Sequence, residues 1–236
     1  MALMVRKASE KDFEKIGAIW QECFCLNDAY LSLLSKHVFN SNSQNTTIYL
    51  LEKNTEILSV FALLPIEYHK EKTTLRGAAL TFVATPKKHR GNKYFHVLFN
   101  RIFSEKHNLD FLIVRPATEQ LSTLYKREGF SIPIMNPMVD SFDIPVLSDT
   151  LPPLDSTSVQ KALKALKPAF VWNKHILEFA LCDAAENAKT ASQLNFTLSC
   201  SREVLKSSIP FAFVKSLSSD ISPEFFSNAF FLITLE

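Results

Sequence analysis

A strand, a basic loop and an amphipathic helix follow one another over residues 81–103, and this junction constrains the fold more than any other segment. The segment reads TFVATPKKHRGNKYFHVLFNRIF, and its apolar residues recur at helical spacing after the loop. The loop "PKKHRGNK" carries four cations, Lys87, Lys88, Arg90 and Lys93. Because a helix N-terminus offers N–H groups without intrahelical partners and a positive dipole end, the junction predicts either an anion site or a solvated surface loop.

Strand and helix patterns alternate along the chain on both sides of this junction. Helices are expected where apolar residues recur at helical spacing, and strands where apolar runs are bounded by turn residues. The expected strands are residues 4–8, 46–51, 57–64, 74–85, 109–116 and 130–135, and the expected helices are 9–24, 28–38, 93–106 and 119–127. This order predicts an α/β (α+β) fold with a mixed sheet and helices on both faces.

The composition of the chain changes after residue 136. Residues 137–158 are rich in Pro, Ser and Asp, which is typical of a linker or crossover. The chain is therefore divided into a first domain over 1–136 and a smaller α+β part over 159–236. The second part is predicted to hold a helix near 157–167 and strands near 175–182, 193–200, 209–215 and 229–235.

Composition narrows the class of protein. The chain is 47% hydrophobic and 21% charged, as in ordinary soluble globular proteins, and no apolar run reaches the length of a membrane span. A net charge of +2 gives no reason to expect nucleic-acid binding. The start of the chain lacks the pattern of a signal peptide, so a cytoplasmic location is expected. Four cysteines without metal-ligand spacing predict reduced thiols and no metal site.

Two motifs resemble those of the GNAT (GCN5-related) N-acetyltransferase family. VATPKKHRGNKYFHVLF resembles its acyl-CoA-binding motif, with Arg90 and Gly91 as the Arg-Gly pair. LDFLIVRPATEQLSTLYKREGF resembles its second motif through "LY" at 124–125 and "GF" at 129–130, and Tyr125 follows Arg90 by 35 residues, as in the family. The resemblance covers roughly residues 1–135 and is closest to the enhanced-intracellular-survival branch.

This resemblance implies the GNAT acyl-CoA N-acyltransferase fold, with the C-terminal α+β part as an extension or a degenerate GNAT-like half. It implies acetyl-CoA as co-substrate, no metal, and direct transfer of the acetyl group to an amine of a small molecule or peptide. No nucleic-acid or membrane partner is implied, and the acceptor and oligomeric state stay open. The implied cofactor-binding residues are Val83, Ala84, Thr85, Lys88, Arg90, Gly91, Asn92, Lys93, Tyr94, Phe95, Thr118 and Glu119.

Tyr125 matches the general acid of the family, which protonates the leaving sulfur. The base is open, because the strand over 74–85 carries no Asp or Glu. Glu67 is a candidate by proximity, and Glu236 is another because the C-terminus reaches the active site in the branch named above. A chain of water molecules is the third candidate.

Two positions depart from the family pattern, since Lys93 and Phe95 stand where the motif has small residues. A side chain at either position could crowd the pyrophosphate, because glycine is used there for close backbone approach. One alternative is therefore a catalytically silent GNAT-like module that binds coenzyme A or a partner. The other is an interaction protein whose basic loop contacts an acidic partner or nucleic acid, with a steep salt dependence.

Overall fold

The computed structural model describes residues 2–39, 46–104, 108–135, 156–165, 168–187, 210, 212–226 and 230–231. These residues form two compact units, and each is described by itself. Unit 1 comprises Met1–Leu64 and Ala79–Asn108, and unit 2 comprises Pro65–Ala78 and Leu109–Glu236. None of the helices in the described part of the chain has the length and apolar character that a membrane span requires.

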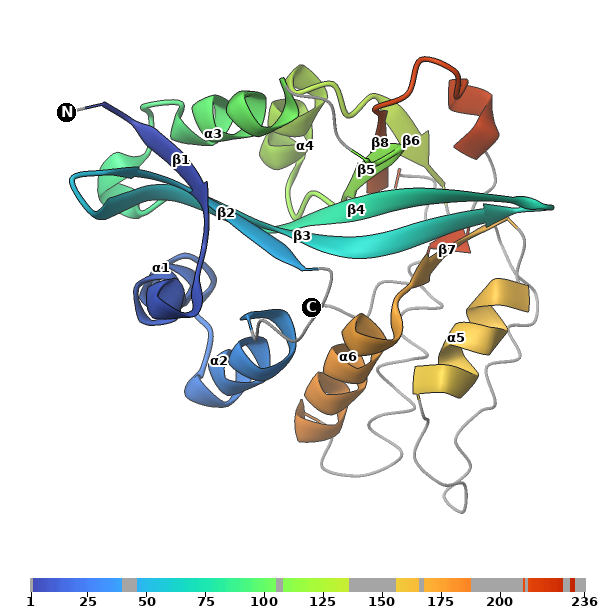
Figure 1. Cartoon of the computed structure of the whole chain (residues 1–236), viewed down its shortest axis with the longest axis horizontal. Helices are drawn as coiled ribbons and strands as arrows, with labels where there is room; N and C mark the ends of the chain where they lie inside the picture. Colours follow the sequence, from blue (N-terminus) through green and yellow to red (C-terminus); the bar gives the residue numbers. More distant parts are fainter. Residues whose placement is uncertain are drawn as a thin grey trace. The chain divides into compact units, whose positions relative to one another are not determined.

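Unit 1 is built on antiparallel strands with helices on both faces. Val5 of β1 lies opposite Leu51 of β2, and Leu50 of β2 lies opposite Val60 of β3, so the predicted hairpin is confirmed. Helices α1 and α2 cover one face and α3 the other (Figure 1). The elements are β1 (Met4–Lys7), β2 (Thr47–Lys53), the first part of β3 (Glu56–Lys70), the last part of β4 (Thr73–Ala84), α1 (Phe13–Phe24), α2 (Asp28–Leu34) and α3 (Tyr94–Phe103).

Aromatic side chains form the core of unit 1. The ring of Phe61 on β3 lies 6.4 Å from that of Phe95 and 6.4 Å from that of Phe99, both on α3. From α1, Ile16 and Trp20 are fully buried, as the helical spacing of their apolar side chains predicts. The buried stripes of the two helices therefore fix which face each helix turns to the sheet.

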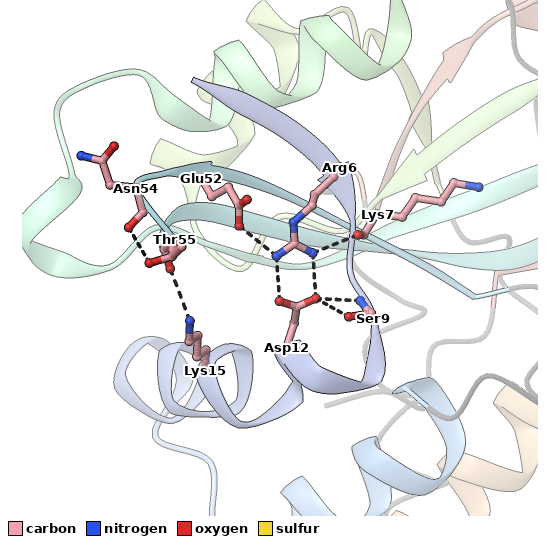
Figure 2. Close-up of polar contacts among 8 residues, drawn as sticks. All are labelled: Arg6, Lys7, Ser9, Asp12, Lys15, Glu52, Asn54 and Thr55. Carbon is pink, nitrogen blue, oxygen red and sulfur yellow. Dashed lines mark hydrogen bonds and ion pairs between the residues drawn. The ribbon is translucent and has the colours of Figure 1, made fainter. Parts of the chain in front are cut away.

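A charged cluster ties β1 to the start of α1 and to β2 (Figure 2). Arg6 donates from Nη1 to Asp12 Oδ2 at 2.7 Å and from Nη2 to Asp12 Oδ1 at 2.8 Å, and Nη2 also donates to Glu52 Oε2 at 2.8 Å. Asp12 also accepts from the N–H of Ser9 at 2.8 Å, which is half of a capping box. These hydrogen bonds from Arg6 and Ser9 hold the pKa of Asp12 well below its usual range.

Unit 2 gathers strands from distant parts of the chain. β8 pairs antiparallel with β5 and with β6, so it lies between them. β7 pairs antiparallel with the last part of β3 and parallel with β9. The elements are β5 (Phe111–Val114), α4 (Glu119–Arg127), β6 (Ile132–Ile134), α5 (Ser156–Ala165), β7 (Ala169–Trp172), α6 (Lys174–Asn187), β8 (Ala212–Ser216) and β9 (Phe230–Phe231).

The predicted strand near 175–182 is wrong, because Lys174–Asn187 forms the helix α6. Asn173 begins it, since its Oδ1 accepts from the N–H of Ile176 at 2.9 Å, as an N-cap side chain does. The segment is rich in Ala, Leu and Glu, which favour helix over strand. The strand of this region is instead the apolar run Ala169–Trp172, which the sequence analysis missed.

Two of the other elements predicted for the C-terminal part are confirmed, and the rest lie wholly or partly outside the described residues. The helix near 157–167 is confirmed as α5 and the strand near 209–215 as β8. The strand near 193–200 lies outside the described residues, and of the strand near 229–235 only Phe230–Phe231 is described. Most of the predicted linker 137–158 also lies outside them, so the domain boundary stays a prediction. The predicted mixed α/β sheet is confirmed.

Aromatic residues also form the core of unit 2. The rings of Tyr68 and Phe170 lie 4.9 Å apart, and Phe226 lies 5.0 Å from Tyr68 and 5.5 Å from Phe111. Gly77 allows this packing, because a Cβ there would overlap the Phe111 ring. The hydroxyl of Tyr68 donates to the backbone oxygen of Phe225 at 2.7 Å, so the C-terminal phenylalanines are tied to β3.

Candidate active site

In unit 1, β4 carries an irregularity just before it ends. Phe82 has a φ of +50° inside the strand, a left-handed conformation that costs a non-glycine residue about 1–2 kcal/mol. The indole Nε1 of Trp20 donates to the backbone oxygen of Phe82 at 3.1 Å, and the two rings lie 5.1 Å apart. Such a kink redirects the backbone groups that follow it. The residues so redirected are the predicted pantetheine contacts Val83, Ala84 and Thr85.

The loop after β4 turns tightly before α3 begins. A 3₁₀ turn over Lys87–His89 leads to Gly91, whose φ of +83° is a conformation that glycine adopts at no steric cost. A Cβ at Gly91 would meet no atom within 4 Å, so backbone conformation and not space requires glycine. Asn92 closes the loop by donating from Nδ2 to the backbone oxygen of His89 at 3.1 Å.

The cations of the loop differ in their surroundings. Lys88 pairs with Glu56 of the β2–β3 hairpin, and His89 Nε2 lies 3.0 Å from the same carboxylate. Arg90 donates from Nε to the backbone oxygen of Thr85 at 3.2 Å, which folds its side chain back over the loop. Lys93 is exposed, and its ammonium makes no ion pair within the part of the chain that the structure describes.

The two departures from the family motif lie in different environments. Phe95 is 8% exposed and packs in the core of unit 1, with its ring 5.6 Å from that of Phe99, whereas Tyr94 is half-buried. Lys93 begins α3 as its N-cap with a φ of +59° and makes no side-chain capping hydrogen bond. The left-handed conformation of Lys93 explains why this position suits glycine, and the burial of Phe95 directs its side chain into the core.

In unit 2, the predicted residues after β5 lie on α4 and its cap. Thr118 is the N-cap, since its Oγ1 accepts from the N–H of Leu121 at 3.2 Å, and Glu119 is exposed in the first turn. Tyr125, one turn from the end of α4, is 5% exposed, and its ring lies 5.9 Å from that of Phe130. Burial raises the pKa of Tyr125 well above its usual value, so the phenol keeps its proton.

A lysine from β8 holds the C-terminal end of α4. Lys215 donates from Nζ to the backbone oxygen of Glu128 at 2.7 Å, and burial lowers the pKa of this lysine. Lys126 lies over the ring of Phe213, also on β8, at 5.0 Å from its centroid. The sequence analysis missed these contacts, because nothing in the sequence near residue 215 points to a helix nearly ninety residues earlier.

Of the two carboxylates that are candidate bases, the structure describes Glu67 and not Glu236. Glu67 on β3 is 48% exposed in its side chain, and its Oε2 lies 2.8 Å from His69 Nε2. His69 Nδ1 in turn lies 3.5 Å from Thr74 Oγ1. Glu236 lies outside the described residues.

Three side chains of α1, those of Trp20, Glu22 and Cys23, make polar contacts with the end of β4 and its loop in unit 1, and the sequence did not predict these contacts. Besides the bond from Trp20, the N–H of Lys87 donates to Glu22 Oε1 at 2.8 Å. Cys23 Sγ lies 3.6 Å from the backbone oxygen of Thr85. Trp20 is buried in the core, as the helical spacing of the apolar residues of α1 predicts, but periodicity alone does not show which carbonyl its N–H meets.

Comparison with known proteins gives a family and a fold. A family model described as "Acetyltransferase (GNAT) domain" matches residues 4–132, more than half of the chain, and no curated protein matches. A GCN5-related N-acetyltransferase from Anabaena variabilis has a TM-score of 0.56 at 15% identity, over 76% of this chain and 48% of that one. Eis1 from Mycobacterium abscessus has a TM-score of 0.55 at 11% identity, over 79% of this chain and 49% of that one. A GCN5-related N-acetyltransferase from Kribbella flavida has a TM-score of 0.52 at 11% identity, over 75% and 48%.

At these identities the likeness to solved structures shows the fold, and the chain spans about half the length of each of them. The likeness to Eis1 agrees with the predicted resemblance to the enhanced-intracellular-survival branch. The family match runs from β1 to β6 and includes both motifs. The family predicted from the two motifs is therefore confirmed, and the chain belongs to the GNAT acetyltransferase family.

Proposed function

We propose that the chain transfers the acetyl group of acetyl-CoA directly to an amine of a small molecule or peptide. Membership of the GNAT family supports acyl transfer in general. The observation that carries the proposal is the form of the loop after β4, in which a left-handed glycine at 91 leads a basic segment into the N-terminus of α3. Such a helix start suits the pyrophosphate of coenzyme A.

In this proposal each part of the loop binds one part of the cofactor. The backbone of Val83–Thr85 pairs with the pantetheine amides as an added strand would. The guanidinium of Arg90 and the ammonium groups of Lys88 and Lys93 contact the pyrophosphate through charge-assisted hydrogen bonds. Thr118 and Glu119 flank the cofactor at the start of α4.

The reaction needs one base and one acid. The base removes a proton from the acceptor ammonium, the neutral amine attacks the thioester carbonyl carbon, and the C–S bond breaks. Tyr125, which its raised pKa keeps protonated at neutral pH, gives its proton to the sulfur as the C–S bond breaks, and the second proton of the attacking nitrogen returns to the phenolate, so that the amide and the thiol leave as neutral products. Glu67, assisted by its contact with His69, is a candidate base, and Glu236 and water remain the alternatives.

The test is calorimetric titration of acetyl-CoA into the wild-type chain, Arg90→Ala and Arg101→Ala. Arg101 is an exposed arginine of α3 outside the loop, so its variant controls for the loss of one surface charge. We expect micromolar binding by the wild type, at least about tenfold weaker binding by Arg90→Ala, and binding within about twofold of wild type for Arg101→Ala. Equal weakening in both variants would refute a specific pyrophosphate contact at Arg90.

A catalytically silent module is the second candidate, and the lysine at position 93 favours it, because the family motif has a small residue there. A folded wild-type chain that does not bind acetyl-CoA would support this candidate against the enzyme. Binding of an acidic partner or nucleic acid, with a steep salt dependence and no preference for the thioester, would instead support an interaction protein.

A further inference from the structure

The end of α1 makes a set of polar contacts with the backbone of β4 and its loop, all within unit 1. Trp20 Nε1 donates to the oxygen of Phe82 at 3.1 Å, and Glu22 Oε1 accepts from the N–H of Lys87 at 2.8 Å. Cys23 Sγ lies 3.6 Å from the oxygen of Thr85. One helix end thus engages the segment at three successive points, the strand kink, the strand end and the loop.

Cys23 also contacts the cation on which the proposed cofactor site depends. Arg90 Nη2 lies 3.8 Å from Cys23 Sγ, while Arg90 Nε donates to the oxygen of Thr85 at 3.2 Å. Cys23, Thr85 and Arg90 therefore contact one another in a closed set of three. A guanidinium held at two of its nitrogens has less conformational freedom, so it loses less entropy when it binds a phosphate.

The hydrogen bond from Trp20 stabilises the strained backbone conformation of Phe82. A left-handed phenylalanine inside a strand persists only where its surroundings hold it. Trp20 is fully buried, its ring lies 5.1 Å from that of Phe82, and its N–H donates to the backbone oxygen of Phe82 at the kink. The kink in turn sets the direction of the backbone groups of Val83, Ala84 and Thr85.

We propose that Trp20 is a positioning residue for the acyl-CoA site, which fixes the kink at Phe82, and that Cys23 performs the same task for Arg90. This inference rests on the proposed function, because it assigns the held segment to acetyl-CoA. Neither side chain touches a reacting atom. Their effect falls on cofactor affinity, because they hold the loop in its binding conformation before the cofactor arrives.

The first test compares Trp20→Phe with Tyr68→Phe. Both substitutions keep a buried aromatic ring and remove one donor to a backbone carbonyl, and Tyr68 belongs to unit 2. We expect similar losses of melting temperature in the two variants. Acetyl-CoA should bind about tenfold more weakly to Trp20→Phe and within twofold of wild type to Tyr68→Phe, by calorimetry.

A second readout does not depend on the cofactor. Amide hydrogen exchange of residues 82–92 should be faster in Trp20→Phe than in wild type and unchanged in Tyr68→Phe, since only the first variant releases the kink. Binding of Trp20→Phe within twofold of wild type, with unchanged exchange in this segment, would overturn the inference. A wild type that does not bind acetyl-CoA would refute the proposed function and this inference with it.

Cys23 provides a milder pair of variants should Trp20→Phe fail to fold. Cys23→Ser keeps a donor and acceptor at the position, whereas Cys23→Ala removes both. We expect the alanine variant to bind acetyl-CoA at least about fivefold more weakly than the serine variant, which should stay close to wild type. Equal affinities for alanine, serine and wild type would show that the contact with Arg90 does not position it.

Discussion

Burial decides the protonation state of Tyr125, the proposed acid. The phenol is 5% exposed near the C-terminal end of α4, and burial raises its pKa because the charged phenolate loses hydration. A group whose pKa is raised above about 10 is protonated at every pH below that value. The phenol is therefore protonated throughout the neutral and mildly alkaline range, as the proposed acid role requires, and it is a poor candidate for the base.

Tyr125→Phe is expected to lower kcat for acetyl transfer by about a hundredfold or more, the usual contribution of a general acid. The ring and its contact with Phe130 remain, so acetyl-CoA should bind within about twofold of wild type. Deprotonation of Tyr125 should not lower the rate of the wild type between pH 8 and about 10, because the acid form persists there. The pH profiles of the wild type and of Tyr125→Phe should therefore not differ by a fall in the wild-type rate over this range. Such a fall would contradict the acid role at this raised pKa. Steady-state rates across pH and calorimetry provide the measurements.

At the scale of elements, the loop between β4 and α3 combines strain with charge. Gly91 and Lys93 both have positive φ, but only the glycine adopts this conformation without cost. Lys93 thus occupies a position that disfavours lysine, and its side chain is exposed without an ion pair among the described residues. In the proposed function the ammonium of Lys93 contacts the pyrophosphate, so its position combines a cost in stability with a gain in binding.

Lys93→Gly is expected to raise the melting temperature by about 2–4 °C, which corresponds to about 1 kcal/mol of relieved strain. Acetyl-CoA should bind about three- to tenfold more weakly, because one charged contact is lost. Tighter binding by this variant would instead mean that the lysine side chain crowds the pyrophosphate. Thermal denaturation and calorimetry measure the two effects.

Gly91→Ala is the matched control for the strain argument in this loop. A Cβ at this position meets open space, so any destabilisation comes from the φ of +83°. Its melting temperature should fall while that of Lys93→Gly rises.

At the scale of the whole molecule, unit 2 depends on strands that are distant in sequence. β8 lies between β5 and β6, with Phe111 opposite Ser216 and Ile132 opposite Val214. Residues 111–114, which form β5, are almost fully buried, and β8 pairs with them along one edge. The C-terminal strand β8 therefore contributes to the stability of β5, the strand of the second motif. The C-terminal part is thus expected to be required for folding and not only to be appended to it.

A fragment of residues 1–136 is expected to lose cooperative thermal unfolding, because it lacks β7 and β8 and exposes the edges of β3, β5 and β6. Circular dichroism during heating and dye binding to exposed apolar surface would detect this. A fragment that unfolds as cooperatively as the whole chain would instead support an independent domain over 1–136.

Much of the fold could be predicted because its signals are local. The periodicity of Ile16 and Trp20 marks α1, and turn residues mark the hairpin of β2 and β3. The prediction failed at α6, where an apolar segment fits both periods and Asn173 was not recognised as an N-cap. The candidate site followed from the resemblance of two motifs, which hold Arg90, Gly91 and Tyr125, to those of the GNAT family.

The sequence by itself determined the family and the secondary structure around the two motifs. Both follow from short stretches of the chain, in which the motif residues and the apolar period lie within a few positions of one another. Only the tertiary structure decided that Trp20 meets the carbonyl of Phe82 and that Cys23 meets Arg90, partners more than sixty residues apart. It also decided that β8 separates β5 from β6, about a hundred residues from the first. The physical reason is that a side chain's burial can be read from its period, whereas its partner depends on how the whole chain packs.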